Sequence, residues 1–115
     1  HLSSDEGQAG GIDSIKPVTA SLRENQSQVS GLAIRGTLAP TIDIPDWILI
    51  LDGDREIYVS DLIFPPKAPV PGFQVFIPSS FFSGKQAEIS AWAVNTNTGS
   101  AVRLAGGSLV NVPAP

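Results

Sequence analysis

The sequence lacks the residue types on which most enzymatic and transition-metal chemistry depends. It contains no cysteine and a single histidine, His1, at its N-terminal end. A nucleophilic serine requires a neighbouring base, which is usually histidine, so a catalytic triad is not expected. Zinc, copper and iron sites are not expected either, because no cluster of histidine or cysteine is present to supply their ligands. The sequence therefore predicts no catalytic residue, no metal site and no cofactor.

Acidic residues do occur, but their spacing argues against a site built from paired carboxylates. Asp43 and Asp46 fall in one expected loop, whereas Asp52, Asp54 and Glu56 fall in another. The strand expected between the two groups separates them by about 17 Å, whereas paired acid catalysis requires a separation of roughly 5–9.5 Å. The second group also lacks the further oxygen ligands of a calcium loop. Both groups are interpreted as solvated turn residues, and a hydrolase or transferase fragment that uses Asp43 or Asp46 is the alternative of a different class.

Basic residues and long apolar segments are also few. Seven lysines and arginines stand against 11 aspartates and glutamates, which gives a formal net charge of -4 and a pI near 4.6. Nucleic acid is an unfavourable partner for such a chain, because binding it depends on neutralising phosphate charge. No apolar segment approaches the ~20 residues that span a bilayer, so no membrane span is expected.

Methionine is absent as well, which indicates that the chain is processed or is a domain excised from a larger protein. Residues 1–13 are polar and glycine-rich without periodicity, and they are predicted to be a disordered terminus or an expression remnant. Residues 14–112 are predicted to form the domain, followed by a tail or linker at 113–115.

The chain does contain short apolar runs that are separated by 11 glycines and 10 prolines. Such frequent interruption argues against long helices, and alternation of period two predicts strands. Seven strands are expected, at residues 18–22, 30–38, 47–51, 56–63, 73–77, 87–94 and 101–104. Residues 109–112 are expected to pair weakly or to leave the domain as a linker. Phe81 or Phe82 is expected to plug the bottom of the core.

Seven short strands with a turn every 8–12 residues or so are typical of an immunoglobulin-like sandwich. The predicted fold is therefore all-β, a seven-stranded antiparallel immunoglobulin-like β-sandwich. A small up-and-down or OB-like barrel would have a similar strand count and is the architectural alternative.

The last third of the chain resembles bacterial immunoglobulin-like and fibronectin-type-III-like surface domains. In the matching residues a Gly84-Lys85 turn leads into the alternating strand 87–95, and a hairpin at Gly99 follows. The chain departs from antibody domains because it lacks the two strand cysteines and a tyrosine near the start of strand 87–94. The resemblance implies an accessory domain of an extracellular, cell-surface or periplasmic protein, which spaces, supports or binds.

One candidate binding surface lies on a sheet face. If Ile89, Ala91 and Ala93 point inward, Trp92 points outward from the same strand. The neighbours expected around Trp92 on that face are Ile48, Ile50, Tyr58 and Arg103. An exposed apolar patch with aromatic and arginine side chains is typical of a protein interface, and aromatic rings also stack on sugars.

A second candidate surface is the end of the sandwich at which three loops, residues 39–46, 64–72 and 95–100, are expected to gather. Prolines stiffen the first two loops, so a partner would lose little entropy in ordering them. Asp43, Asp46, Asn95 and Asn97 are the candidate binding residues there. Elsewhere, the tripeptide that begins at Asn25 matches a glycosylation sequon in a predicted loop.

Together these observations predict a non-catalytic, extracytoplasmic immunoglobulin-like module of a larger protein. Its predicted role is protein–protein interaction or structural support, with a protein partner or a neighbouring domain of the parent protein as the bound species. A carbohydrate-binding accessory module, with a glycan as the ligand, is the nearest alternative.

Overall fold

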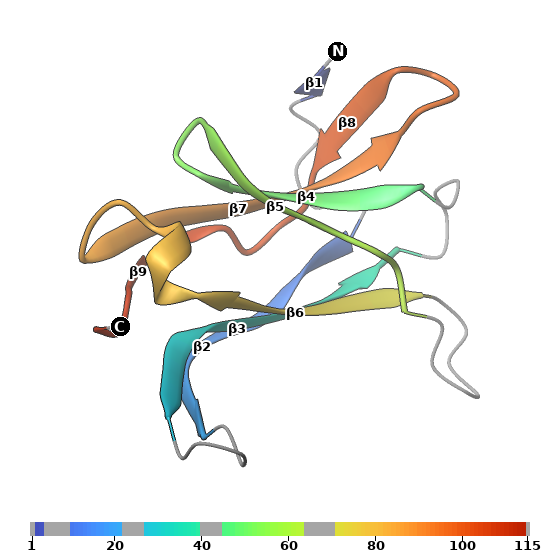
Figure 1. Cartoon of the computed structure of the whole chain (residues 1–115). Helices are drawn as coiled ribbons and strands as arrows, with labels where there is room; N and C mark the ends of the chain where they lie inside the picture. Colours follow the sequence, from blue (N-terminus) through green and yellow to red (C-terminus); the bar gives the residue numbers. More distant parts are fainter. Residues whose placement is uncertain (1, 4–9, 22–26, 40–44, 64–70, 115) are drawn as a thin grey trace.

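The computed structural model describes residues 2–3, 10–21, 27–39, 45–63 and 71–114. These residues form two β-sheets that pack face to face (Figure 1), which confirms the all-β sandwich. Its strands are β1 (Leu2–Ser3), β2 (Gly10–Ser21), β3 (Gln28–Leu38), β4 (Trp47–Asp52), β5 (Arg55–Ser60), β6 (Gly72–Pro78), β7 (Gln86–Asn95), β8 (Ser100–Arg103) and β9 (Ser108–Asn111), with one helical turn, η1 (Ser79–Phe81). The strands β1 and β9 are additional to the seven predicted strands.

The larger sheet has the strand order β1-β8-β7-β4-β5, and β9 pairs with the free part of the β7 edge beside β8. The smaller sheet has the order β2-β3-β6. Pairing between the described strands is antiparallel throughout, except for the short parallel pair of β1 and β8. Strands that follow each other in the sequence thus often pair, as in β2 with β3, β4 with β5 and β7 with β8.

The first long strand, β2, begins well before the predicted start at residue 18 and also before the predicted domain boundary at residue 14. A bulge between Ile12 and Ser14 shifts its register against β3. Because of this extra residue, Ile12 and Ile15 both pack against the core although they lie three positions apart. The bulge hides the strand from a search for strict alternation, and part of the segment predicted to be disordered is therefore strand.

Backbone hydrogen bonds outside the paired strands join two further pairs of segments in the sandwich. Ile63 lies outside β5 and exchanges hydrogen bonds with Gly72 at 2.7 and 2.8 Å, so the prediction that this strand extends to residue 63 is wrong. Ile12 N–H donates to Ala105 O at 2.8 Å, and Ala105 N–H donates to Gly10 O at 3.0 Å. The second pair of bonds joins the start of β2 in the smaller sheet to the segment after β8 in the larger one.

Residues of alternating parity on the facing strands form the core. Strands β3, β6 and β4 contribute large aliphatic and aromatic side chains, whereas β7 of the larger sheet contributes mostly alanines, so bulky and small residues are combined in one packed core. The buried core side chains are Leu32, Ile34, Leu38, Ile48, Ile50, Phe73, Val75, Ile77, Phe82, Ala87, Ile89, Ala91, Ala93 and Leu104. Phe82 rather than Phe81 is the buried member of its pair.

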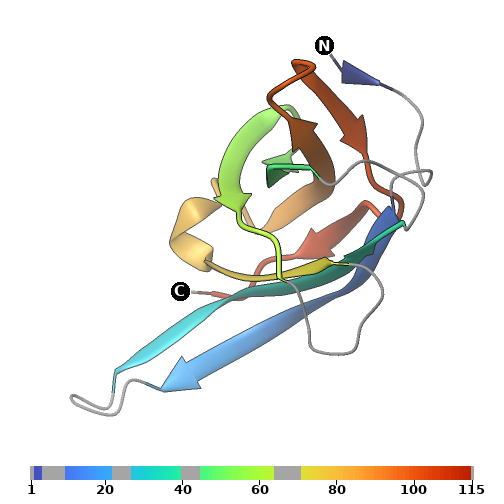
Figure 2. The ribbon, with the colours of Figure 1, turned by 90° about the vertical axis from the view of Figure 1, so that its right-hand side faces the viewer.

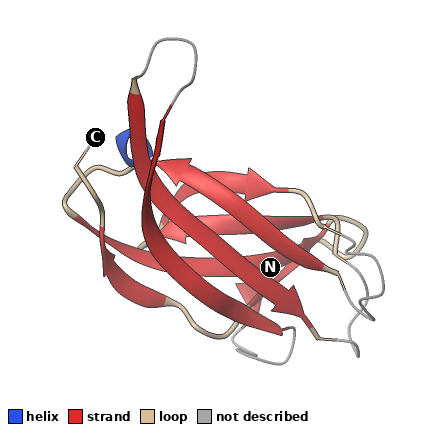
Figure 3. Cartoon of the chain, turned by 90° about the horizontal axis from the view of Figure 1, so that it is seen from below, coloured by secondary structure: helices blue, strands red, loops and turns tan. Residues whose placement is uncertain are grey.

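The β2–β3 hairpin extends beyond the rest of the sandwich as a two-stranded ribbon (Figures 2 and 3). It does so because β6 pairs with β3 only over residues 31–37, whereas β2 follows β3 as far as Gln28. Pro17 lies in β2, which is an edge strand, where a residue without an N–H is tolerated. The proline also removes a donor that another strand would otherwise use for pairing. Of the sequon that begins at Asn25, only Ser27 is among the described residues.

Candidate recognition face

The outer face of the larger sheet gathers apolar side chains that the strand register places side by side. On β4 and β7, Leu49 lies opposite Trp92, and Trp47 lies opposite Val94. On the other side of β4, Leu49 lies opposite Val59 of β5. Cross-strand partners point to the same side of a sheet. These five residues, Trp47, Leu49, Val59, Trp92 and Val94, are called the tryptophan face below.

The tryptophan face is accessible to solvent over three neighbouring strands. Trp47 is 43% exposed and Val59 is 56% exposed, and the other three side chains are partly exposed. Single exposed apolar residues are common on proteins, but contiguous ones mark surfaces that bind something. The contiguity follows from the register, which makes Leu49 a neighbour of both Trp92 and Val59.

Trp92 is held in a fixed position on this face. Its indole Nε1–H donates a hydrogen bond to Ser90 Oγ at 3.1 Å. The Arg103 guanidinium carbon lies 5.8 Å from the centre of the indole ring, which is the distance of a cation–π contact. Arg103 is the direct cross-strand partner of Trp92, on β8. A ring fixed in this way loses little conformational entropy when a partner covers it.

Arg103 carries a positive charge at the border of the tryptophan face that no described acidic residue neutralises. Its Nε atom is buried and has no hydrogen-bond partner among the residues that the structure describes. The side chain as a whole is partly exposed. An arginine presents five N–H donors, and a carboxylate accepts two of them at once. The arrangement therefore favours a partner that brings a carboxylate to the edge of an apolar contact.

The prediction that Ile48 and Ile50 lie on this face with Trp92 is wrong, because both side chains are fully buried in the core. Residues 47–51 are apolar at both parities, so alternation could not decide which residues point inward. The register decides it, since Ile50 pairs with the buried Ala91 whereas Leu49 pairs with Trp92.

Tyr58 also lies elsewhere than predicted. It is the cross-strand partner of Ile50 and so belongs to the inward side of β5, although the edge position of this strand leaves it 37% exposed. Its ring centre lies 6.3 Å from that of Phe81 in η1. Val59 takes the place on the tryptophan face that the sequence interpretation gave to Tyr58. Trp92 and Arg103 are the two predicted residues that the structure places together.

At the loop end of the sandwich, Asp46 fastens one loop to another. Its carboxylate accepts hydrogen bonds from Thr96 N–H at 2.7 Å and from Thr96 Oγ1 at 2.5 Å. The bond from the Thr96 hydroxyl, and to a smaller extent the bond from the Thr96 N–H, lower the pKa of Asp46 below its ordinary value of 3.8. The predicted proximity of these two loops is confirmed for Asp46 and the 96–99 turn, whereas Asp43 lies outside the described residues.

The two asparagines of this end also have local structural partners. Asn95 Oδ1 accepts hydrogen bonds from the N–H groups of Asn97 and Thr98, at 3.0 and 3.4 Å. Gly99 follows with a φ of 68°, which is typical of glycine in a hairpin turn. The side chain of Asn95 thus shapes its own turn, and Asn97 at the exposed tip is the one that remains available as a binding residue.

The bonds of Asp46 make a specific pH dependence testable. Because the pKa of this carboxyl is lowered in the folded protein, ionised Asp46 stabilises the fold above its ordinary pKa, and this contribution is lost as the pH falls through the lowered value. We expect Asp46→Asn to lower the Tm by a few degrees at pH 7, and the difference from the unaltered protein to narrow below pH ~4. Thermal unfolding followed by circular dichroism measures both. Asp54→Asn, at an exposed turn, is the control; a gap that stays constant down to pH ~2 would contradict the assignment.

The second acidic group is also engaged in structural contacts. Asp52 Oδ1 accepts a hydrogen bond from Glu88 N–H at 3.0 Å, and Asp52 Oδ2 lies 3.8 Å from Arg55 Nη2. Over the described ranges, no three or more His, Cys, Asp or Glu side chains lie together in a way that would hold a metal ion. Asp52 therefore connects the end of β4 to β7 and to the first residue of β5.

No protein family model, no curated protein and no solved structure matches this chain. Within the described residues, no helix is long and apolar enough to cross a membrane.

Proposed function

We propose that this domain is a non-catalytic recognition module of a larger extracytoplasmic protein and that it docks a protein partner through the tryptophan face. The observation that carries the proposal is the contiguous exposure of Trp47 and Val59 beside the fixed ring of Trp92. Tryptophan and arginine are enriched among the residues that dominate binding energy in protein interfaces. The tryptophan face with Arg103 at its border combines both residue types.

The partner that fits this surface has an apolar patch with a carboxylate at its border. The apolar patch would cover the tryptophan face, and the carboxylate would pair with the guanidinium of Arg103. Arg103 lies beside Trp92, so both contacts fall within one small area. A carboxylate at this position would fix the orientation of the partner more than it would add to the affinity.

The immunoglobulin-like assignment, and with it the extracytoplasmic location, is part of the proposal. The order of the strands supports it: β2-β3-β6 and β5-β4-β7-β8 correspond to the A-B-E and C′-C-F-G sheets of such sandwiches. The parallel strand β1 and the late strand β9 are additions to that plan. Fold alone does not assign function, and the proposal therefore rests on the tryptophan face.

A carbohydrate ligand is the second candidate, and the presence of two tryptophans on one face favours it, since indole rings stack on sugars. Titration with polysaccharides distinguishes the two candidates. A saturable change in tryptophan fluorescence that Trp92→Ala abolishes would assign the face to a glycan. No change over the same titration is the result expected for a face that binds protein.

Site-specific photo-crosslinking in the full-length protein tests the proposal directly. We expect benzoylphenylalanine at position 59, on the tryptophan face, to give one discrete protein adduct in the native source. The same group at position 97, at the exposed tip of the loop end, is the matched control and is expected to give none.

Three further results bear on the proposal. Trp92→Ala should weaken formation of the adduct by about 30-fold or more, since truncating a central tryptophan costs about 2 kcal/mol or more. An adduct from position 97 but not from position 59 would contradict the proposal and assign recognition to the loop end. If neither position 59 nor position 97 gave an adduct, recognition of a protein by the tryptophan face and by the loop end would both be contradicted.

A further inference from the structure

The outer face of the smaller sheet, opposite the tryptophan face, carries a second group of convergent side chains. Ser14, Arg35 and Gln74 are cross-strand partners, and they form one row over β2, β3 and β6. In the next row, Lys16 and Ala33 are partners, and Ala33 is also the partner of Phe76. Partners in a row point to the same side of the sheet, so two cations, an amide and a hydroxyl meet on one surface.

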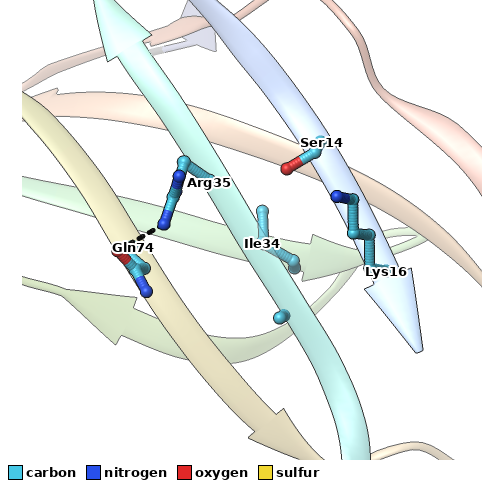
Figure 4. Close-up of a pocket in the computed structure, with 6 residues that line it drawn as sticks. Ser14, Lys16, Ile34, Arg35 and Gln74 are labelled. Atoms are coloured by element: carbon cyan, nitrogen blue, oxygen red, sulfur yellow. Dashed lines mark hydrogen bonds between the residues drawn. The ribbon is translucent and has the colours of Figure 1, made fainter. Parts of the chain in front are cut away.

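A shallow cleft lies within these two rows. It has a volume of about 150 Å³, and it is lined by Ser14, Lys16, Ala33, Ile34, Arg35 and Gln74. In the register the long side chains of Lys16 and Arg35 lie diagonally across the two rows, and the short side chains of Ser14 and Ala33 occupy the other two positions. Figure 4 shows Ser14 and Lys16 on β2 and Arg35 with Gln74 on the other side of the cleft.

The two cations in this cleft have no acidic partner among the described residues. Arg35 Nη2 donates to Gln74 Oε1 at 3.2 Å, which holds the guanidinium in place and leaves its other N–H groups available (Figure 4). Neither Lys16 nor Arg35 lies within ion-pair distance of a described carboxylate. The acid next to this row, Asp13, accepts a hydrogen bond from Thr37 Oγ1 at 2.7 Å.

This pair of cations is unusual in a chain with this charge balance. The chain has seven basic residues against 11 acidic ones, yet two of the seven share one small cleft. A carboxylate is the group that matches it, because it accepts two hydrogen bonds from a guanidinium and a further one from an ammonium. Ser14 Oγ and the Gln74 amide nitrogen lie beside the cations, and they match the hydroxyl groups of a polyhydroxylated ligand.

An aromatic ring continues the surface at the end of the second row. Phe76 is 36% exposed. Its ring lies over Gly31, where a Cβ atom would be 2.8 Å from Phe76 Cζ. This glycine therefore permits the ring to lie close to the sheet. A ring in this position offers a flat apolar surface, and the C–H face of a sugar ring packs on such a surface.

We infer that this cleft binds the carboxylate of an acidic sugar unit, a hexuronate, within a polysaccharide. Arg35 and Lys16 hold the carboxylate, Ser14 and Gln74 bind hydroxyl groups, and Phe76 supports the adjacent ring. The open shape of the cleft suits one unit of a chain that continues on both sides. The inference is independent of the proposed function, since the two surfaces lie on different sheets.

The test is a titration of the ¹⁵N-labelled domain with oligogalacturonate, followed by NMR at low ionic strength. We expect saturable shifts for the backbone amides around Arg35 and Gln74, and no shift with neutral gluco-oligosaccharides of equal length. We expect Arg35→Gln to weaken the affinity at least tenfold. Arg55→Gln removes the same charge at the exposed start of β5, in the other sheet, and is expected to change the affinity less than twofold.

A second variant separates binding from loss of structure. Asp13→Asn removes the nearby negative charge and is expected to raise the affinity two- to threefold while the spectrum stays folded. Equal weakening by Arg35→Gln and Arg55→Gln would overturn the inference, because it would show nonspecific attraction by charge. Equal binding of the neutral sugars, shifts caused by polyglutamate but not by oligogalacturonate, or no binding of oligogalacturonate would overturn it as well.

Discussion

Replacing Gly36 with alanine is expected to destabilise the domain by about 3 kcal/mol, since forcing extra atoms into a packed core has effects of this size. A Cβ atom at this position would lie 2.2 Å from Phe73 Cζ and 2.7 Å from the carbonyl oxygen of Gly11. Phe73 is itself fully buried, so its ring cannot turn out into solvent without leaving the core. For a domain of this size, the Tm should fall by roughly 10–20 °C in a thermal unfolding experiment.

Two companion variants distinguish this steric cause from a general intolerance of the glycine positions in this domain to a methyl group. Gly84→Ala is the matched control, because a Cβ there meets only the carbonyl oxygen of Gln86, at 3.9 Å, and it should change the stability by less than about 0.5 kcal/mol. Adding Phe73→Leu to Gly36→Ala should recover part of the loss relative to the sum of the two single changes. Strict additivity, or a neutral Gly36→Ala, would contradict this description of the core.

The parts of the fold that the sequence predicts well are those in which one face is buried and the other is polar. In β6, Phe73, Val75 and Ile77 alternate with exposed residues, and the structure buries all three. In β7, the alternation correctly places Trp92 outside and Ile89 inside. Period two is informative there because a shift by one residue would expose the apolar set.

Alternation fails where it meets a local irregularity or a strand that is apolar on both sides. The bulge in β2 puts Ile12 and Ile15 on one side and conceals the strand. In β4, both parities are apolar, and the facing residue of the neighbouring strand decides which one is buried. This information is long-range, so it is absent from the local pattern. For the same reason, Trp47 and Val59 were missed as members of the tryptophan face.

Candidate polar residues in loops were harder still to interpret from sequence. Asp46 and Asn95 look like exposed ligands in the sequence, but each one makes hydrogen bonds to turn backbone. Short polar side chains at turns commonly serve the turn itself. Lys16 and Arg35, which line the cleft on the smaller sheet, are 19 positions apart and come together only through strand pairing.

The orientation of β4 both creates the tryptophan face and fills the core. Ile50→Ala and Leu49→Ala test it as a pair of neighbouring substitutions with similar side chains. Ile50 is fully buried, whereas Leu49 is partly exposed next to Trp92. We expect Ile50→Ala to cost about 3–4 kcal/mol and Leu49→Ala about 1 kcal/mol, because only the first leaves a cavity in the core.

Urea unfolding of the two variants beside the unaltered domain, with similar slopes in all three, measures this difference most directly. The predicted result is a loss for Ile50→Ala that is at least twice that for Leu49→Ala. Equal losses, or a larger loss for Leu49→Ala, would mean that β4 faces the other way, and the tryptophan face would then not exist as described.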